Sequence, residues 1–79
     1  PGLAPERVAQ AVLHKELLER ALGSLPPLYR EVLVLRHQEN LDYREISAVL
    51  QIPDGTVKNR LFRARDLLRR KLEEAGFEG

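Results

Sequence analysis

Apolar residues recur along this chain at intervals of three and four positions, and no stretch shows the apolar-polar alternation of a half-buried strand. The pattern predicts four helices, at about residues 5–22, 27–37, 43–50 and 54–74. Gly23 marks the end of the first helix, as glycine often does. The second begins at Pro26 and Pro27, because a proline in the first turn lacks only an N–H that would have no partner within the helix. We therefore expect an all-α, four-helix domain.

The apolar stripes indicate which side of each helix faces the core. In the first two helices the stripe residues are Val8, Val12, Leu13, Leu17, Ala21, Leu28, Val32 and Leu35. In the third helix they are Ile46, Val49 and Leu50. In the fourth helix, at about 100° per residue, a sector about 80° wide holds Val57, Leu61, Ala64, Leu68 and Leu72.

Local signals mark the ends of the last two helices. Asp42 and Glu45 are spaced as a capping box, in which each side chain accepts a hydrogen bond from a backbone N–H. Residues 51–53 form a tight turn, and Asp54 then places a negative charge at the positive end of the next helix dipole. Gly76 ends that helix. A short helix, a tight turn and a longer helix over about residues 42–74 predict a C-terminal helix-turn-helix.

The net charge of +1 hides an uneven distribution. Residues 58–71 hold seven Lys or Arg against one Asp, whereas residues 1–57 hold six against eight Asp or Glu. Such a basic stripe attracts polyanions, although a charge run by itself is more often a solvated helix face. Its place on the second helix of a helix-turn-helix favours double-stranded DNA, since that helix is the one that enters the major groove.

The candidate DNA-binding residues lie mainly on the fourth helix, with Asn59 and Arg63 opposite the apolar stripe, Lys58 and Phe62 on the shoulder of that side, and Arg60 and Arg65 flanking the stripe. The candidates for bases are Lys58, Asn59, Phe62 and Arg63, and those for phosphates are Arg44, Thr56, Arg60 and Arg65. Arg63 leads the first group because its guanidinium fork matches the O6 and N7 acceptors of guanine. The Phe62 ring either meets a thymine methyl group or packs on a neighbouring helix, and the pattern leaves both open. Thr56 would offer its hydroxyl and backbone N–H to a phosphate.

Other chemistry finds no support in the sequence. The chain has no Cys, and neither His14 nor His37 has a second ligand at a metal-binding spacing. It has no nucleophile beside a base, no glycine-rich phosphate loop and no paired carboxylates, so we expect neither an enzyme nor a cofactor.

The expected location follows from two further patterns. No apolar run reaches the roughly 20 residues that span a bilayer, and no signal peptide opens the chain, so we expect a cytoplasmic protein without membrane insertion. The chain has no Met and begins with Pro1 and Gly2, which indicates a piece excised from a longer protein or, alternatively, a processed product.

Three motifs occur in order along the chain: LPPLYREVLVLR at residues 25–36, LDYREI at residues 41–46 and IPDGTVKNRLFRAR at residues 52–65. Together they resemble domain 4, the C-terminal promoter-reading domain, of bacterial sigma factors, and most of all the extracytoplasmic-function group. The resemblance covers about residues 15–72. Three linked motifs at the right spacing are far more specific than a generic helix-turn-helix.

The resemblance implies a transcription-initiation module that recognises the −35 promoter element for RNA polymerase. In this family, base-reading positions match Lys58, Asn59, Phe62 and Arg63, and backbone-contacting positions match Arg60 and Arg65. The family domain also docks on the flap of the polymerase β subunit through its earlier helices. Many members are held inactive by an anti-sigma protein that covers this domain, so the resemblance adds such a partner.

Three residues depart from the family pattern. Gln51 stands where glycine is usual, which costs roughly 1 kcal/mol if that position is left-handed. Ser47 replaces a usual alanine at a close helix contact, so its hydroxyl needs a local backbone acceptor. Asn59 replaces a common serine and bears on base preference. The family's promoter-melting domain 2 is missing from this chain, so we do not expect the chain alone to start transcription.

Two other functions compete with this interpretation. One is the output domain of a response-regulator-type activator, which has a related helix-turn-helix; the Leu25-Pro26 motif and the basic tail to Lys71 count against it. The other is a protein-interaction module whose basic stripe docks on an acidic partner. Affinity for the polymerase flap separates the first rival, and salt-dependent DNA binding separates the second.

Overall fold

The computed structural model describes residues 4–76, which are helical almost throughout and contain no strand. In chain order the elements are α1 (Pro5–Ser24), α2 (Pro27–Leu33), the π-helix η1 (Val34–Gln38), α3 (Tyr43–Leu50) and α4 (Asp54–Glu74). The all-α class and the C-terminal helix-turn-helix are confirmed, and α3 and α4 have the predicted bounds. None of the described helices is both long enough and apolar enough to cross a membrane.

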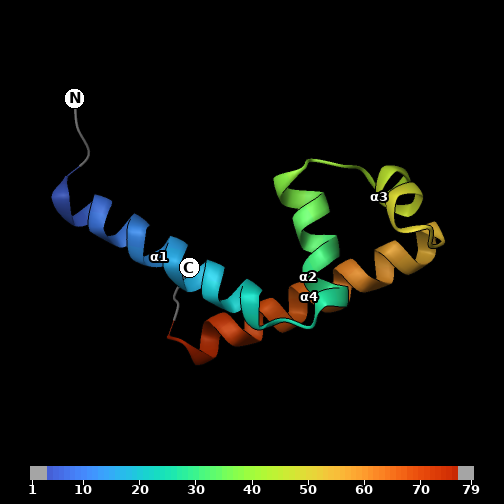
Figure 1. The fold of residues 1–79 in the computed structure, drawn as a ribbon. Coiled ribbons are helices and arrows are strands. Elements are labelled where there is room, and N and C mark those ends of the chain that lie inside the picture. The colour runs from blue at the N-terminus through green and yellow to red at the C-terminus, as the bar shows by residue number, and fades with distance from the viewer. Residues whose placement is uncertain (1–3, 77–79) are drawn as a thin grey trace.

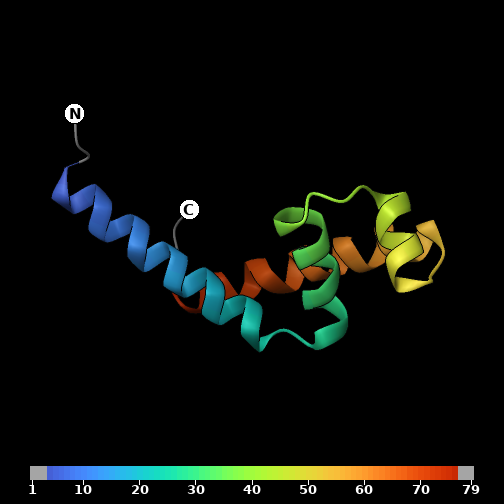
Figure 2. The ribbon, with the colours of Figure 1, turned by 45° about the horizontal axis from the view of Figure 1, so that its top comes forward.

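Helix α4 is the element on which the others pack (Figure 1). Helix α3 lies at its N-terminal end, α2 crosses its middle, and the C-terminal part of α1 lies beside its C-terminal half. The rest of α1 projects away from this body in both views (Figure 2). The short turn between α3 and α4 therefore holds the two helices of the helix-turn-helix against each other at one end of the molecule.

The core lies where α2, α3 and α4 meet. Its buried residues, with Ala21 at the α1 contact, are Leu25, Val32, Leu33, Ile46, Val57, Leu61 and Ala64. Four of the larger side chains are completely buried, and each such burial contributes about 1.5–3 kcal/mol relative to exposure. The predicted stripe of α4 is thus confirmed at its first three positions, while Leu68 and Leu72 are half-buried.

The prediction of a buried stripe along the whole of α1 is wrong. Val8, Val12 and Leu13 are 45%, 52% and 53% exposed, and only Ala21 near the end of the helix is buried. The reason is the placement of α1, whose N-terminal half extends past the other helices and has no described element to pack against. The helix also continues through Gly23 to Ser24, whose hydroxyl donates to the carbonyl of Ala21 (2.7 Å).

Two expected core residues of the next helices are exposed as well. Leu28 is 42% exposed, and the buried residues of α2 are Val32 and Leu33. Val49 is 58% exposed. Helix α3 is only eight residues long and buries a narrow stripe centred on Ile46, so a position slightly to one side of that stripe faces solvent.

The sequence pattern predicted one continuous helix over about residues 27–37, but its last turn is not α-helical. Its last turn widens into η1, in which the N–H of Glu39 donates to the carbonyl of Val34 five residues earlier (3.1 Å). Two hydrogen bonds then hold the backbone of Leu41: its N–H donates to the carbonyl of Leu35 (3.0 Å), and its carbonyl accepts from Nη1 of Arg36 (3.1 Å). The wide turn ends the helix and leads the chain back towards α3.

The turn of the helix-turn-helix is closed by hydrogen bonds around Ser47. The backbone carbonyl of Ser47 accepts from the N–H groups of Gln51 and Ile52, and the Ser47 hydroxyl donates to the carbonyl of Ile52. Gln51 has φ 56° and ψ 48°, so this position is left-handed. At the start of α3 both bonds of the Asp42–Glu45 capping box are present, at 2.8 and 2.9 Å. The capping box and the local acceptor for the Ser47 hydroxyl are confirmed, and the left-handed conformation that the sequence left as a condition at Gln51 is present.

Replacing Gln51 with glycine is expected to raise the free energy of unfolding by about 0.5–1 kcal/mol. Glycine adopts the left-handed conformation without the clash that a Cβ brings, and it returns part of that gain through the greater entropy of the unfolded chain. Urea unfolding followed by circular dichroism measures the change. Ala48→Gly, three residues earlier and inside α3, is the matched control and should cost about 1 kcal/mol. Equal losses for both variants would contradict a left-handed Gln51.

Candidate nucleic-acid interface

The exposed side of α4 is determined by its buried side. Because Val57, Leu61 and Ala64 face the core, the opposite side of the helix lies in solvent. The four candidates for base contacts, Lys58, Asn59, Phe62 and Arg63, are all exposed. The Phe62 side chain is 74% exposed, so it does not pack on a neighbouring helix. The structure thus brings an amide, a ring and two cations together on one side of the N-terminal half of α4.

The candidates for phosphate contacts occupy the flanks of this surface. Arg65 of α4 and Arg44 of α3 are exposed, while Arg60 and Thr56 are half-buried. The backbone N–H of Thr56 donates to the carbonyl of Pro53 (3.0 Å), as the i to i−3 geometry at a helix start allows. In the DNA-free chain this N–H is therefore already hydrogen-bonded, and the phosphate contact of Thr56 stays a prediction that rests on its hydroxyl.

The C-terminal half of α4 neutralises much of its own charge. Asp66 accepts from Nη2 of Arg69 (2.7 Å) and pairs with Nε of Arg70 (3.1 Å), while Nη1 of Arg69 also binds Glu73 (2.7 Å). The hydrogen bond from Arg69 and the charges of both arginines hold the pKa of the Asp66 carboxyl below its usual value. Within residues 4–76, Lys58, Arg60 and Arg63 make no such pair, so the unbalanced positive charge lies nearest the turn.

Sequence reasoning missed one contact at the edge of this surface. Nη2 of Arg65 lies 3.5 Å from Nε2 of His37 on η1, although the two residues are 28 positions apart. Partial burial, and then the charges of Arg65 and Arg36, lower the pKa of His37. No local spacing rule signals this pair, since only the fold brings the two residues together. No group of three His, Cys, Asp or Glu in the described chain is placed to hold a metal ion.

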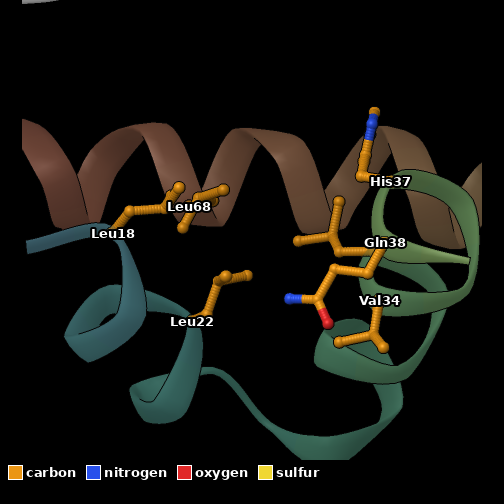
Figure 3. Close-up of a pocket in the computed structure, with 7 residues that line it drawn as sticks. Leu18, Leu22, Val34, His37, Gln38 and Leu68 are labelled. Atoms are coloured by element: carbon orange, nitrogen blue, oxygen red, sulfur yellow. The ribbon is translucent and has the colours of Figure 1, made fainter. Parts of the chain in front are cut away.

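An apolar pocket of about 340 Å³ lies on the inner side of η1 (Figure 3). It is lined by Leu18, Leu22, Leu33, Val34, His37, Gln38 and Leu68. In the close-up the leucines of α1 and α4 face Val34 and Gln38 across the cavity, and the His37 ring extends away from it. His37 therefore lines the edge of the pocket, and its ring points away from the pocket.

The fold and this surface define a helix-turn-helix domain with an exposed basic second helix. A family model described as sigma-70, region 4 matches residues 15–68, and the chain belongs to that family.

Two curated relatives are similar to this chain in sequence. The chain is 36% identical over 73 residues to the ECF RNA polymerase sigma factor SigW of Bacillus subtilis, and 35% identical over 69 residues to the ECF RNA polymerase sigma-E factor of Escherichia coli K12. These matches cover 92% and 87% of this chain but only 39% and 36% of the relatives, so the chain spans well under half of their length.

Asp66→Asn is expected to tighten binding to duplex DNA of any sequence. The change removes the acidic side chain that pairs with Arg69 and Arg70, and it adds one unit of positive charge to the stripe. Fluorescence anisotropy on two unrelated duplexes measures the effect, which should shrink as salt is added. Glu73→Gln is the control: it also adds one unit of charge but lies two turns farther from the turn. An equal gain in affinity from both variants would show that the net charge of the chain, and not the position of the charge, determines DNA affinity.

Proposed function

We propose that this chain is the −35-reading domain of an extracytoplasmic-function sigma factor and that it places α4 in the major groove of promoter DNA. The observation that carries the proposal is the unpaired, exposed basic surface at the N-terminal half of α4, directly after the turn, in a chain of the sigma-70 region 4 family. The relatives are named as RNA polymerase sigma factors, which supports the same role here. Family membership also favours it over the response-regulator alternative.

The residues divide between reading and positioning. Arg63 donates two hydrogen bonds to a guanine, with Lys58 and Asn59 beside it at base edges, and the exposed Phe62 ring meets a thymine methyl group. Arg65 and Arg60 on the flanks of α4 bind phosphates, which set the register of the helix without reading sequence. Arg44 on α3 and the hydroxyl of Thr56 add phosphate contacts at the other end of the motif. This module has no enzymatic step and acts in the cytoplasm.

Arg63→Ala is expected to weaken binding to a GGAAC-type −35 duplex by about 1–3 kcal/mol and to leave binding to a scrambled duplex nearly unchanged. Arg65→Ala should weaken both duplexes alike and lower the dependence of affinity on salt, because a phosphate contact carries no sequence information. Anisotropy titrations over a salt series measure both effects. Identical losses on the two duplexes for both variants would reject the assignment of Arg63 to bases.

Outcomes for the unmodified chain separate the remaining alternatives. Tighter, salt-dependent binding to the −35 duplex than to the scrambled one supports the proposal. Equal affinities would leave attraction to phosphates alone, with no reading by α4. No binding at low salt would favour a module that docks its basic stripe on an acidic protein.

The same proposal includes a contact with RNA polymerase through α2. A surface hollow of about 320 Å³ is lined by Pro27, Arg30, Glu31, Val34 and Leu35. Leu28, seven residues before Leu35, lies on the same face of the helix and is 42% exposed. An exposed apolar group beside a hollow suits docking on the β-subunit flap. An anti-sigma protein that covered this surface or α4 would block the function.

Leu28→Ser is expected to weaken binding of the chain to the isolated β flap by about tenfold, since it removes an apolar side chain from the proposed contact. Its affinity for the −35 duplex should be unchanged, because Leu28 lies on α2 and is not one of the proposed DNA-contacting residues. Val49→Ser, an exposed apolar residue on α3, is the matched control and should leave flap binding intact. Loss of flap binding in Val49→Ser alone would show that the contact lies on α3 and would reject the assignment to α2.

A further inference from the structure

His37 and Arg65 form a pair on the outer flank of α4 that no local motif explains. Both side chains are exposed, and Nη2 of Arg65 lies 3.5 Å from Nε2 of His37. A guanidinium can only donate, so Nε2 must be the acceptor and the imidazole must be neutral in this arrangement. A distance of 3.5 Å is long for a hydrogen bond, so the contact is weak and easily exchanged for a better partner.

The charges around the imidazole are all positive. Arg65 faces it from α4, and Arg36 adjoins it on η1. The other elements packed on η1 supply no opposing charge that shifts the ring: besides burial, the pKa of His37 responds only to Arg65 and Arg36, and to no carboxylate of α2 or α3. No described carboxylate balances the two cations. A cluster of this kind leaves room for an anion and disfavours a third positive charge until an anion arrives.

We propose that His37, which lies outside the helix-turn-helix, is a further DNA-contacting residue: in its protonated form it shares with Arg65 the phosphate that Arg65 binds. The inference rests on the proposed function, and specifically on Arg65 meeting a phosphate. An oxygen that accepts from Arg65 at about 2.8 Å lies within about 6 Å of Nε2 of His37, a range in which an opposite charge favours the ionised form.

The sign of the pH dependence follows from the two states. In the free chain the pKa of His37 lies below its ordinary value of 6.5, because burial and two neighbouring cations oppose the charged form. In the complex the phosphate favours that form and raises the pKa. The complex therefore binds more protons than the free chain, and affinity rises as the pH falls from the pKa of the complex to that of the free chain. Above this window His37 is neutral in both states and contributes nothing.

The test is a pH series of duplex affinities at constant ionic strength, from about pH 8 to about pH 5.5, where histidine titrates. For a difference of about one unit between the two pKa values, the unmodified chain should bind the −35 duplex about tenfold more tightly at the acidic end. His37→Gln keeps a polar side chain that does not titrate, so its affinity should stay at the high-pH level. His37→Lys carries a permanent charge and should bind tightly at every pH.

His14→Gln is the matched control, because His14 is the other histidine of the chain and lies on α1. It should retain the full pH dependence. A second readout is the NMR titration of the His37 ring, whose pKa should rise when the duplex is added. An unchanged pH slope in His37→Gln, or an unchanged pKa on binding, overturns the inference while leaving the proposed function intact. Absence of duplex binding by every variant at every pH overturns both.

Discussion

The structure depends on one apolar stripe, because α4 is at once the centre of the core and the carrier of the basic surface. Val57, Leu61 and Ala64 are completely buried, and α1, α2 and α3 all pack on α4. Rotating α4 about its axis would expose those side chains and bury cations, both at a cost of several kcal/mol. The core therefore fixes which side of α4 faces outward, and the basic surface needs no further support of its own.

Charge on that outward side is graded along the helix. Asp66 is the one acidic residue among residues 58–71, and its position in the second half of α4 decides where positive charge is compensated. Arg69 and Arg70 are held by it, and Arg69 also by Glu73, whereas the cations nearer the turn are not paired in this way. A polyanion is drawn most strongly to the unpaired end, which is also the end that carries the exposed ring of Phe62.

Sequence reasoning succeeded where the cause is local and failed where it is not. Helical periodicity and the Asp42–Glu45 capping box are set by neighbours within five residues and were predictable, whereas the left-handed conformation of Gln51 was raised only as a condition, by the glycine that the resembled family usually has there. Burial of an apolar side chain depends on where another helix lies, so Val49 was misassigned although its spacing fits the stripe. The contact of His37 with Arg65 joins two helices 28 residues apart and had no sequence signal. Exposure of Lys58, Asn59 and Arg63 followed from periodicity, because α4 has a single buried face, whereas the exposure of Phe62 became clear only from the positions of the other helices.

The turn shows how a departure from the family pattern is accommodated. A side chain at the left-handed Gln51 costs about 1 kcal/mol, yet the segment keeps this conformation. Ser47 explains why: its carbonyl accepts two backbone N–H groups and its hydroxyl binds the carbonyl of Ile52, each bond contributing about 0.5–1.5 kcal/mol. These bonds outweigh the strain and close the turn between α3 and α4. Only the hydroxyl bond depends on the serine, because the two carbonyl bonds belong to the backbone, so the departure at Ser47 adds one local bond to the same turn in which Gln51 departs from glycine.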